Sequence, residues 1–254
     1  MLKEKLRKKE LTLGSWITIP HPSIAEILAS AGYDWLVIDL EHTTISIAEA
    51  GELIRVIDLC GVAPLVRLTS NQPDQIKRVM DAGAHGIVVP MVCSVEDAKK
   101  AIAATRYAPH GIRGVGLARA QKFGPGFTDY LQWQKDGPVV IVQIEHKDAL
   151  ENLEEIFSEP GVDGFIIGPY DLSCSMGMPG EFERLEFKEA INHILKTGLR
   201  MNFPAGIHIV EPDQKQLRQV ISEGYSFIGY SVDFRILDDS SRKGISVAKG
   251  IVNS

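Results

Sequence analysis

Cysteine is scarce in this chain of 254 residues, and the scarcity limits the kinds of site that the chain can build. The three cysteines, Cys60, Cys93 and Cys174, lie far apart in the sequence. Their number and spacing exclude a disulfide framework and a zinc knuckle. So low a cysteine content is typical of a reducing cytoplasm, which is the location we expect.

An excess of positive charge is also missing. Lysine and arginine total 27 against 33 for aspartate and glutamate, which gives a net charge of −6. Such a surface has no electrostatic reason to bind nucleic acid or an anionic membrane, so we expect neither partner. Long apolar runs are absent, and none follows the basic residues 1–9. The sequence therefore predicts no transmembrane span and no signal peptide.

The overall composition is that of an ordinary globular protein. With 44% hydrophobic and 24% charged residues, the chain is neither disordered nor collagen-like. No linker, shift in composition or low-complexity tract divides it. We expect a single domain over residues 1–254, with an amphipathic helix in 1–11 and a C-terminal tail over 234–254.

Short apolar runs recur along the whole chain and predict eight strands. They are nearly continuous rather than alternating, as strands covered on both faces should be. The runs are 14–18, 35–39, 63–67, 86–90, 139–145, 164–169, 205–209 and 227–233.

Segments with helical spacing lie between most of these runs, at 23–32, 46–61, 72–83, 95–107, 148–161, 185–198 and 212–224. Several of them end in a glycine that would cap the helix, namely Gly32, Gly61, Gly83, Gly198 and Gly224. Repeated strand–helix units predict a parallel sheet closed into a (β/α)8 barrel. An open doubly wound sheet is the alternative, which is disfavoured because no glycine-rich phosphate loop opens the first helix. Residues 108–127 break the rhythm as a long, basic, glycine-rich loop, which is either functional or plain surface.

Polar side chains gather where the predicted strands end. Active sites of α/β barrels lie at the C-terminal ends of the strands, so four separate stretches should meet at one rim. These residues are Asp39, Glu41 and His42 after the second strand, Arg67 after the third, Gln143 and Glu145 in the fifth, and Gly168, Tyr170 and Asp171 after the sixth.

Glu145 and Asp171 are the candidate metal ligands. Two carboxylates from neighbouring strands, completed by water and substrate oxygens, suit Mg²⁺ or Mn²⁺, with Co²⁺ as a further option. Zinc is disfavoured because no Cys or His pair has ligand spacing. Taken singly, Glu145 has the alternative of a helix N-terminal charge, and Asp171 that of an N-cap or turn residue.

The remaining rim residues have the chemistry of acid–base catalysis and anion binding. His42 is a candidate general base that Asp39 and Glu41 could orient, with a plain surface histidine as the alternative. Arg67 would clamp an anion or stabilise oxyanion charge, or would form a salt bridge in the barrel mouth. Gln143 would bind a substrate oxygen or fill the barrel as a satisfied polar residue. His208 has a weaker claim to reach the pocket, and Trp16 reads as core.

At these residues the chain resembles the HpcH/HpaI aldolase family, the metal-dependent class II pyruvate aldolases of the phosphoenolpyruvate/pyruvate barrel superfamily. The resemblance extends over about residues 12–236. The matching stretches are GYDWLVIDLEH (32–42), PLVR (64–67), DAGAHGIVVP (81–90), ATRYAPHGIRGVG (104–116), VQIE (142–145) and GVDGFIIGPYDLSCSMG (161–177).

The resemblance implies a role for each matching position. Glu145 and Asp171 match the metal-binding carboxylates, His42 the catalytic histidine, Arg67 the arginine beside the keto oxygen, and Gln143 a glutamine at the substrate. The backbone around Gly168, Tyr170 and Asp171 matches the site of the pyruvate carboxylate, and Asp81 matches an aspartate that reaches a neighbouring subunit's site. The family further implies a hexamer, a trimer of dimers with an exchanged C-terminal helix. Tyr170 departs from the family, which mostly carries a small residue there.

The resulting hypothesis is reversible aldol cleavage of a 4-hydroxy-2-oxo acid, of the 2-keto-3-deoxy sugar acid or 2,4-dihydroxyhept-2-enedioate type, to pyruvate and an aldehyde. Three alternatives stay open. One is a related barrel lyase that cleaves an acyl-CoA ester, for which Arg113, Arg119 and Lys122 of the long loop could bind phosphate, or that decarboxylates oxaloacetate. Another is a Schiff-base aldolase using Lys147. The last is a catalytically silent barrel.

Overall fold

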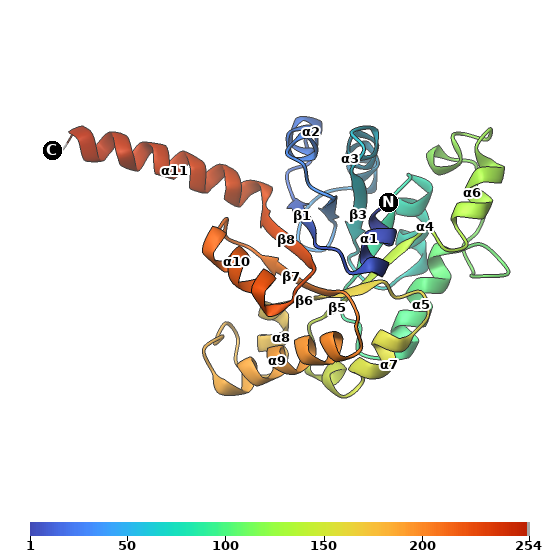
Figure 1. Cartoon of the computed structure of the whole chain (residues 1–254). Coiled ribbons are helices and arrows are strands. Elements are labelled where there is room, and N and C mark those ends of the chain that lie inside the picture. The colour runs from blue at the N-terminus through green and yellow to red at the C-terminus, as the bar shows by residue number, and fades with distance from the viewer. Residues whose placement is uncertain (253–254) are drawn as a thin grey trace.

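The computed structural model describes residues 1–252, in which eight parallel strands form a closed barrel (Figure 1). Each strand pairs with the next in sequence, and β8 closes the barrel against β1. This confirms the predicted (β/α)8 class, with strand bounds that differ from the expected ones by no more than two residues. The strands are β1 (Thr12–Ile17), β2 (Trp35–Asp39), β3 (Ala63–Arg67), β4 (Gly86–Val89), β5 (Val139–Ile144), β6 (Gly164–Ile167), β7 (Ala205–Ile209) and β8 (Phe227–Val232).

Helices surround the barrel and bury one apolar face each against the outside of the sheet. Local capping explains where several of them begin. Ser46 and Ser94 each accept a hydrogen bond from the third helical residue, which returns one through its carboxylate. The helices that follow the predicted positions are α2 (Pro22–Ser30), α3 (Ile47–Leu59), α4 (Pro73–Asp81), α5 (Val95–Thr105), α7 (Leu153–Ser158), α9 (Leu185–Arg200) and α10 (Gln214–Glu223).

Three features differ from the sequence-based expectations. Helices α6 (Phe127–Trp133) and α8 (Pro169–Ser175) were not foreseen, because each is only two turns long. The expected helix 148–161 is divided into the 3₁₀ turn η2 (Lys147–Glu151) and α7. The C-terminal tail forms the helix that the family resemblance implied, α11 (Asp233–Val252).

Gly198 was expected to cap a helix, and this prediction was wrong. It lies within α9, where a Cβ would come within 2.6 Å of the Phe165 ring, so this glycine permits a close helix–strand approach. The other four glycines that were predicted to end helices do have positive φ, as a left-handed cap requires.

The inside of the barrel is a second apolar core, separate from the layer between sheet and helices. At its centre the Trp35 indole stacks on Phe227 with ring centroids 4.1 Å apart. Helix α1 (Leu2–Lys8) closes the N-terminal end by inserting Leu2 and Leu6 into this core. The Lys3 ammonium is anchored there by Pro138 O, 2.7 Å away. The opposite, C-terminal end is therefore the only end of the barrel that the described residues leave open to a ligand.

Helix α11 extends away from the barrel body (Figure 1). Residues 240–250 are all exposed, and they include the apolar side chains of Ile245 and Val247. Within residues 1–252, no helix has the length and apolar character needed to cross a membrane.

We expect Gly14→Ala to destabilise the barrel strongly. A Cβ at Gly14 would lie 2.0 Å from the buried Trp35 indole, which is itself held by Phe227 and has nowhere to move. Overpacking of this kind costs about 3 kcal/mol of unfolding free energy. Gly51→Ala in α3 is the matched control, since its Cβ would meet only Ala82 at 4.0 Å. Urea denaturation should show Gly51→Ala unchanged or slightly stabilised, and equal stability of the two variants would contradict the close packing.

Candidate active site

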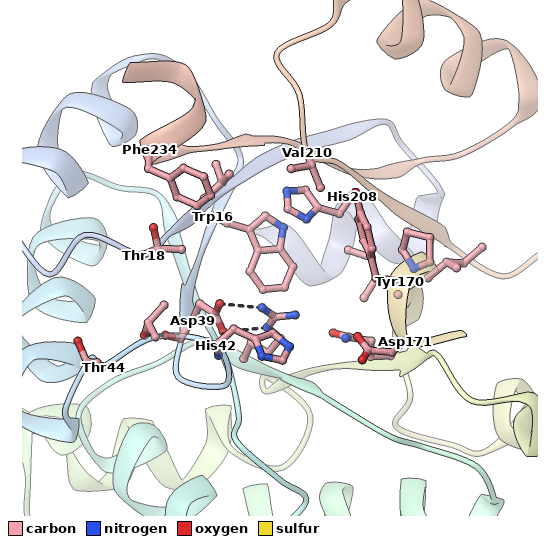
Figure 2. Close-up of a pocket in the computed structure, with 18 residues that line it drawn as sticks. Trp16, Thr18, Asp39, His42, Thr44, Tyr170, Asp171, His208, Val210 and Phe234 are labelled. Atoms are coloured by element: carbon pink, nitrogen blue, oxygen red, sulfur yellow. Dashed lines mark hydrogen bonds and ion pairs between the residues drawn. The ribbon is translucent and has the colours of Figure 1, made fainter. Parts of the chain in front are cut away.

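A cavity of about 740 Å³ opens at the C-terminal end of the barrel (Figure 2). Its walls come from seven of the eight strands and the segments that follow them. Side chains alternate along a strand, so every second residue points into the barrel. This alternation turns Asp39, Arg67, Gln143 and His208 inward. The inward residues one step below them are Val37, Leu65, Ile141 and Gly206.

Asp39 and Arg67 form the central ion pair of the pocket. The Asp39 carboxylate accepts hydrogen bonds from Arg67 Nε at 2.9 Å and from Nη2 at 2.7 Å. Burial alone would raise the pKa of Asp39, but the hydrogen bonds and charge of Arg67 hold that pKa below its usual value. Arg67 also lies over the Trp16 ring, 4.4 Å from its centroid. Asp39 thereby fixes the edge of the guanidinium formed by Nε and Nη2, and Nη1 can donate a hydrogen bond to a ligand.

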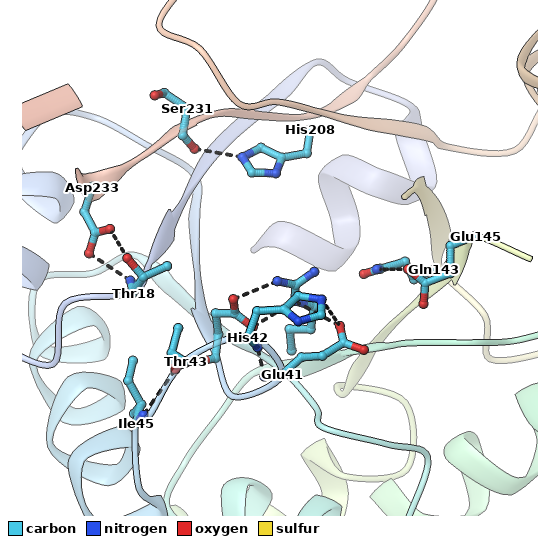
Figure 3. A network of polar contacts seen from close by, with 12 residues as sticks. Thr18, Glu41, His42, Thr43, Ile45, Gln143, Glu145, His208, Ser231 and Asp233 are labelled. Atoms are coloured by element: carbon cyan, nitrogen blue, oxygen red, sulfur yellow. Dashed lines mark hydrogen bonds and ion pairs between the residues drawn. The ribbon is translucent and has the colours of Figure 1, made fainter. Parts of the chain in front are cut away.

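The loop after β2 holds Glu41 and His42 beside this pair. Asp39 Oδ1 accepts hydrogen bonds from the backbone N–H groups of Glu41 and His42, and it does not touch the His42 imidazole. The residue that faces that imidazole is Glu41, whose Oε2 lies 3.7 Å from His42 Nε2 (Figure 3). Asp39 therefore shapes the loop and orients Arg67, while His42 keeps an exposed imidazole at the pocket wall.

Glu145 is a buried carboxylate next to the pocket floor. Its Oε1 accepts from Met91 N at 2.7 Å, and Met91 adopts a positive φ of 54° to present this N–H. Its Oε2 accepts from Gln143 Nε2 (Figure 3). Gly168 leaves room for the carboxylate, since a Cβ there would come within 2.6 Å of Oε2.

The electrostatics around Glu145 favour a cation. Burial, helped by the charges of Glu41 and Asp171, raises the pKa of Glu145 to about 7 against the hydrogen bonds that it accepts. Glu41 has a pKa of about 7 for the same leading reason, burial. Three carboxylates thus sit close enough to repel one another, a repulsion that a bound dication would relieve.

The sixth strand runs into helix α8, which lines the pocket with Tyr170 and Asp171. Pro169 occupies the first helical position, where a backbone N–H would have no acceptor within the helix. The N–H groups of the next two residues also have no acceptor within the helix and can bind a ligand. The Tyr170 ring packs edge-on against Phe182, with centroids 4.9 Å apart. Asp171 is exposed to the cavity, unlike the buried Glu145.

A family model described as HpcH/HpaI aldolase/citrate lyase matches residues 12–239. The chain belongs to this family. It is 35% identical over 249 residues to the 2-keto-3-deoxy-L-rhamnonate aldolase of Escherichia coli strain K12, a match that covers 97% of this chain and 92% of the relative.

Solved structures of the same family agree in fold. An HpcH/HpaI aldolase/citrate lyase family protein from Burkholderia cenocepacia superposes with a TM-score of 0.91 at 33% identity, covering 98% of both chains. The HpcH/HpaI aldolase of Desulfitobacterium hafniense gives a TM-score of 0.89 at 29% identity, covering 98% of this chain and 96% of that one.

Membership in the HpcH/HpaI family makes this protein an enzyme, a carbon–carbon lyase of the aldolase type. The family is one of metal-dependent aldolases, so a divalent metal belongs to the site. Within residues 1–252 no group of three or more His, Cys, Asp or Glu side chains is arranged to hold a metal. The pair Glu145 and Asp171 stays a prediction, in which water and substrate would fill the other positions around the metal.

Two predicted site residues are not among those that line this pocket: Glu145, which contacts the lining residue Gln143, and Asp81, which lies away from it. Asp81 ends α4, where its Oδ1 is buried without a hydrogen-bond partner and lies 4.0 Å from Arg113 Nε. Burial raises the pKa of Asp81. The long loop 108–127 lies on the same side, and none of its residues is among those that line the cavity. Its Arg113 is stacked on Tyr107, with 4.3 Å between the guanidinium carbon and the ring centroid.

Several lining residues were missed or undervalued. Trp16 was interpreted as core, yet it both fills the barrel and forms a pocket wall beneath Arg67. Thr18, Val210 and Phe234 also line the cavity. Each follows or ends a strand, so the strand-end rule that located His42 and Arg67 would have found them as well.

We expect cation binding to release protons near neutral pH. Glu145 has a pKa of about 7, raised from 4.5, so a substantial fraction is protonated at pH 6.5, and a dication binds only the carboxylate form. Apparent Mg²⁺ affinity should therefore rise from pH 5.5 to about 8 and then level off. Calorimetry in buffers of different ionisation enthalpy measures the protons released. Glu145→Gln should abolish the release, and a pH-independent affinity in the unmodified enzyme would contradict the raised pKa.

Proposed function

We propose that this enzyme reversibly cleaves a 4-hydroxy-2-oxo acid to pyruvate and an aldehyde, with a divalent metal held by Glu145 and Asp171. The substrates in question are of the 2-keto-3-deoxy sugar acid or 2,4-dihydroxyhept-2-enedioate type. The observation that carries the proposal is that Asp171, a fixed guanidinium and an accessible imidazole line one cavity, with the buried Glu145 bound to the lining residue Gln143. The likeness to an aldolase that is named for a 2-keto-3-deoxy sugar acid supports it.

The two carboxylates fit a hard dication. Both are oxygen donors, which Mg²⁺, Mn²⁺ and Co²⁺ accept, and no cysteine lines the cavity as a competing soft ligand. When bound, such a metal would act as a Lewis acid toward the 2-oxo acid and favour its enolate. Gln143 would steady this arrangement, because its Nε2 binds Glu145 while its buried Oε1 has no partner and is free to accept from water or substrate.

Arg67 would stabilise the negative charge that develops on the keto oxygen. Asp39 holds its Nε and Nη2, so the guanidinium enters the reaction already oriented. Such preorganised donors lower the barrier without reorganising at the moment of reaction. The free N–H groups of Tyr170 and Asp171 at the start of α8 would bind the substrate carboxylate.

His42 would move the proton on the aldehyde side. In cleavage it would accept the proton of the 4-hydroxyl group, directly or through a water, and in synthesis it would return that proton to the aldehyde oxygen. Its imidazole is exposed at the pocket wall, with Glu41 as its nearest carboxylate. Tyr170 also lines the cavity, and we expect its ring to narrow the space that a small residue would leave open.

The alternatives fit the site less well. No lysine lines the cavity, and Lys147 is exposed at the start of η2, which disfavours Schiff-base chemistry. The loop arginines are committed elsewhere, since Arg113 donates to Tyr130 Oη at 2.7 Å and Arg119 to Asp58 at 2.5 Å. They are poor candidates for a CoA phosphate. Decarboxylation of oxaloacetate would use the same enolate and is the second reaction to assay.

We propose further that the enzyme is a hexamer, a trimer of dimers, in which α11 packs on a neighbouring subunit and Asp81 reaches a neighbouring site. The exposed apolar side chains of α11 and the placement of Asp81 outside its own pocket support this. Sedimentation velocity tests it through the mass. The three free cysteines support a cytoplasmic location for the enzyme, since a reducing compartment preserves thiols.

We expect pyruvate release to depend on added metal. Protein stripped with a chelator should release pyruvate from 4-hydroxy-2-oxo acids at least about 100-fold faster after Mg²⁺ or Mn²⁺ is restored, because the enolate lacks its main charge stabiliser otherwise. A coupled lactate dehydrogenase assay over a panel of such acids, with oxaloacetate included, measures this. Equal rates with and without metal, together with borohydride trapping of pyruvate, would overturn the proposal.

His42→Ala should separate proton transfer from metal binding. We expect kcat to fall by about 100-fold or more, because general acid–base catalysis commonly contributes that much. Metal affinity, measured by Mn²⁺ paramagnetic titration, should stay as in the unmodified enzyme. Asp171→Asn, in contrast, should lose Mn²⁺ affinity.

Two exposed residues outside the cavity provide matched controls for these variants. His110→Ala and Asp129→Asn should leave both kcat and Mn²⁺ affinity unchanged. Unchanged Mn²⁺ affinity in Asp171→Asn would remove Asp171 from the ligand set.

A further inference from the structure

One wall of the cavity is aromatic and aliphatic, and it contains a single histidine. Trp16, Val210 and Phe234 form this wall across from Asp39 and Asp171, and His208 lies among them (Figure 2). Val232 also lines the cavity. A cavity of about 740 Å³ has room for a ligand considerably larger than pyruvate. If the carboxylate side binds the 2-oxo acid end, this wall receives the aldehyde fragment.

The backbone of β8 sets the tautomer of His208. Its Nε2 lies 3.0 Å from Ser231 O, and a carbonyl oxygen can only accept, so Nε2 carries the hydrogen. Ser231 has a positive φ of 59° at the end of β8, an uncommon conformation that aims this carbonyl. The Ser231 hydroxyl donates to Val210 O at 3.0 Å and helps to hold the backbone there. Nδ1 is consequently an unprotonated hydrogen-bond acceptor.

Packing also sets the direction in which Nδ1 points. His208 and Gly229 are partners across β7 and β8, and a Cβ at Gly229 would come within 3.2 Å of His208 Cδ2. The Cδ2 edge of the ring therefore lies against β8, and the opposite edge, with Nδ1, faces the cavity (Figure 3). The ring is further held against Trp16, with centroids 5.0 Å apart. Among residues 1–252 none donates a hydrogen bond to Nδ1.

The imidazole stays neutral over the range in which the enzyme would work. Burial, with a smaller contribution from the Arg67 charge, lowers the pKa of His208 to about 4 against the opposing effects of the Ser231 hydrogen bond and the Asp39 charge. Nδ1 therefore carries no proton in this range, and its lone pair needs a hydrogen bond from another group. A group that enters this side of the cavity must bring its own donor, or it leaves a buried acceptor unpaired.

We propose that His208 is a specificity-determining residue that accepts, at Nδ1, a hydrogen bond from a hydroxyl group on the aldehyde fragment of the substrate. The inference rests on the proposed aldolase function and narrows it to hydroxylated aldehydes rather than purely aliphatic ones. The aliphatic and aromatic neighbours hold the carbon chain, and the histidine selects for the hydroxyl.

The test compares aldehydes that differ only in hydroxyl groups. Aldol addition of pyruvate to propanal, 2-hydroxypropanal, 3-hydroxypropanal and glyceraldehyde is followed with the unmodified enzyme and with His208→Leu. We expect His208→Leu to lower kcat/KM by about 10-fold to 100-fold for at least one hydroxylated aldehyde and to leave the value for propanal within about 3-fold. Intrinsic reactivity of each aldehyde cancels, because the same aldehyde is compared between variants.

Matched variants separate recognition from a general effect of losing a histidine. His193→Leu removes an exposed histidine whose Nε2 also bonds a backbone carbonyl, Leu150 O at 3.2 Å, and it should change no aldehyde preference. His208→Gln keeps both a donor and an acceptor and should restore part of the preference. If His208→Leu does not fold, ¹⁵N spectra of the unmodified enzyme should show the Nδ1 resonance shifting with pyruvate plus a hydroxylated aldehyde and not with propanal.

Two results would overturn the proposal while leaving the aldolase function intact. One is an equal loss of kcat/KM for all four aldehydes in His208→Leu, and the other is no loss for any of them. An Nδ1 resonance that responds alike to propanal and to its hydroxylated counterparts would have the same meaning. Failure of the unmodified enzyme to form product with any aldehyde would instead reject the proposed function itself.

Discussion

Closure of the parallel sheet is the constraint on which the rest of this structure depends. Once β8 pairs with β1, every second side chain of each strand must point into a narrow interior. At the N-terminal end and middle that interior is filled by residues such as Trp35 and Phe227, so it cannot admit a ligand. The same alternation continued toward the C-terminal end leaves Asp39, Arg67 and Gln143 facing one another. The packed lower barrel is thus what forces the polar residues into a single site.

The carboxylates of the polar site are arranged around the positive charge of Arg67. Asp39 is strongly paired with it and keeps a lowered pKa. The partly buried Glu41, 3.4 Å from Arg67 Nε, and the buried Glu145 have no equally strong partner, and their pKa values are about 7. A protein interior does not retain such carboxylates for stability, because burial without full pairing is costly. Their clustering has a ready explanation in the divalent metal of the HpcH/HpaI family, which would supply the missing positive charge.

The cavity has two chemically different sides, and only one of them consists of residues that match the family's motifs. The carboxylate and arginine side consists of the residues that match the family's motifs. The side formed by Trp16, His208 and Phe234 is not part of those motifs, and there the tautomer and direction of one imidazole are imposed by the backbone of β8. Chemistry common to a family and selectivity particular to one chain can therefore sit on opposite walls of the same pocket.

Local patterns in the sequence determined most of the architecture and half of the site. Continuous apolar runs identify the eight strands, because strands covered on both faces leave little freedom of composition. Strand ends then locate His42, Arg67 and Glu145. Short helices such as α8 were not predicted, because two turns carry too little periodicity to be distinguished from a loop. Gly198 was misread, since a glycine that makes room for Phe165 looks the same in sequence as one that caps a helix.

Only the tertiary structure decided the relations between residues far apart in the chain. It showed that Asp39 binds Arg67 rather than the His42 imidazole, that Asp81 lies outside its own pocket, and that His208 presents Nδ1 to the cavity. The physical reason is that strand identity depends on neighbours along the chain, whereas hydrogen-bond partners, burial and pKa depend on what closure of the barrel brings across from other strands.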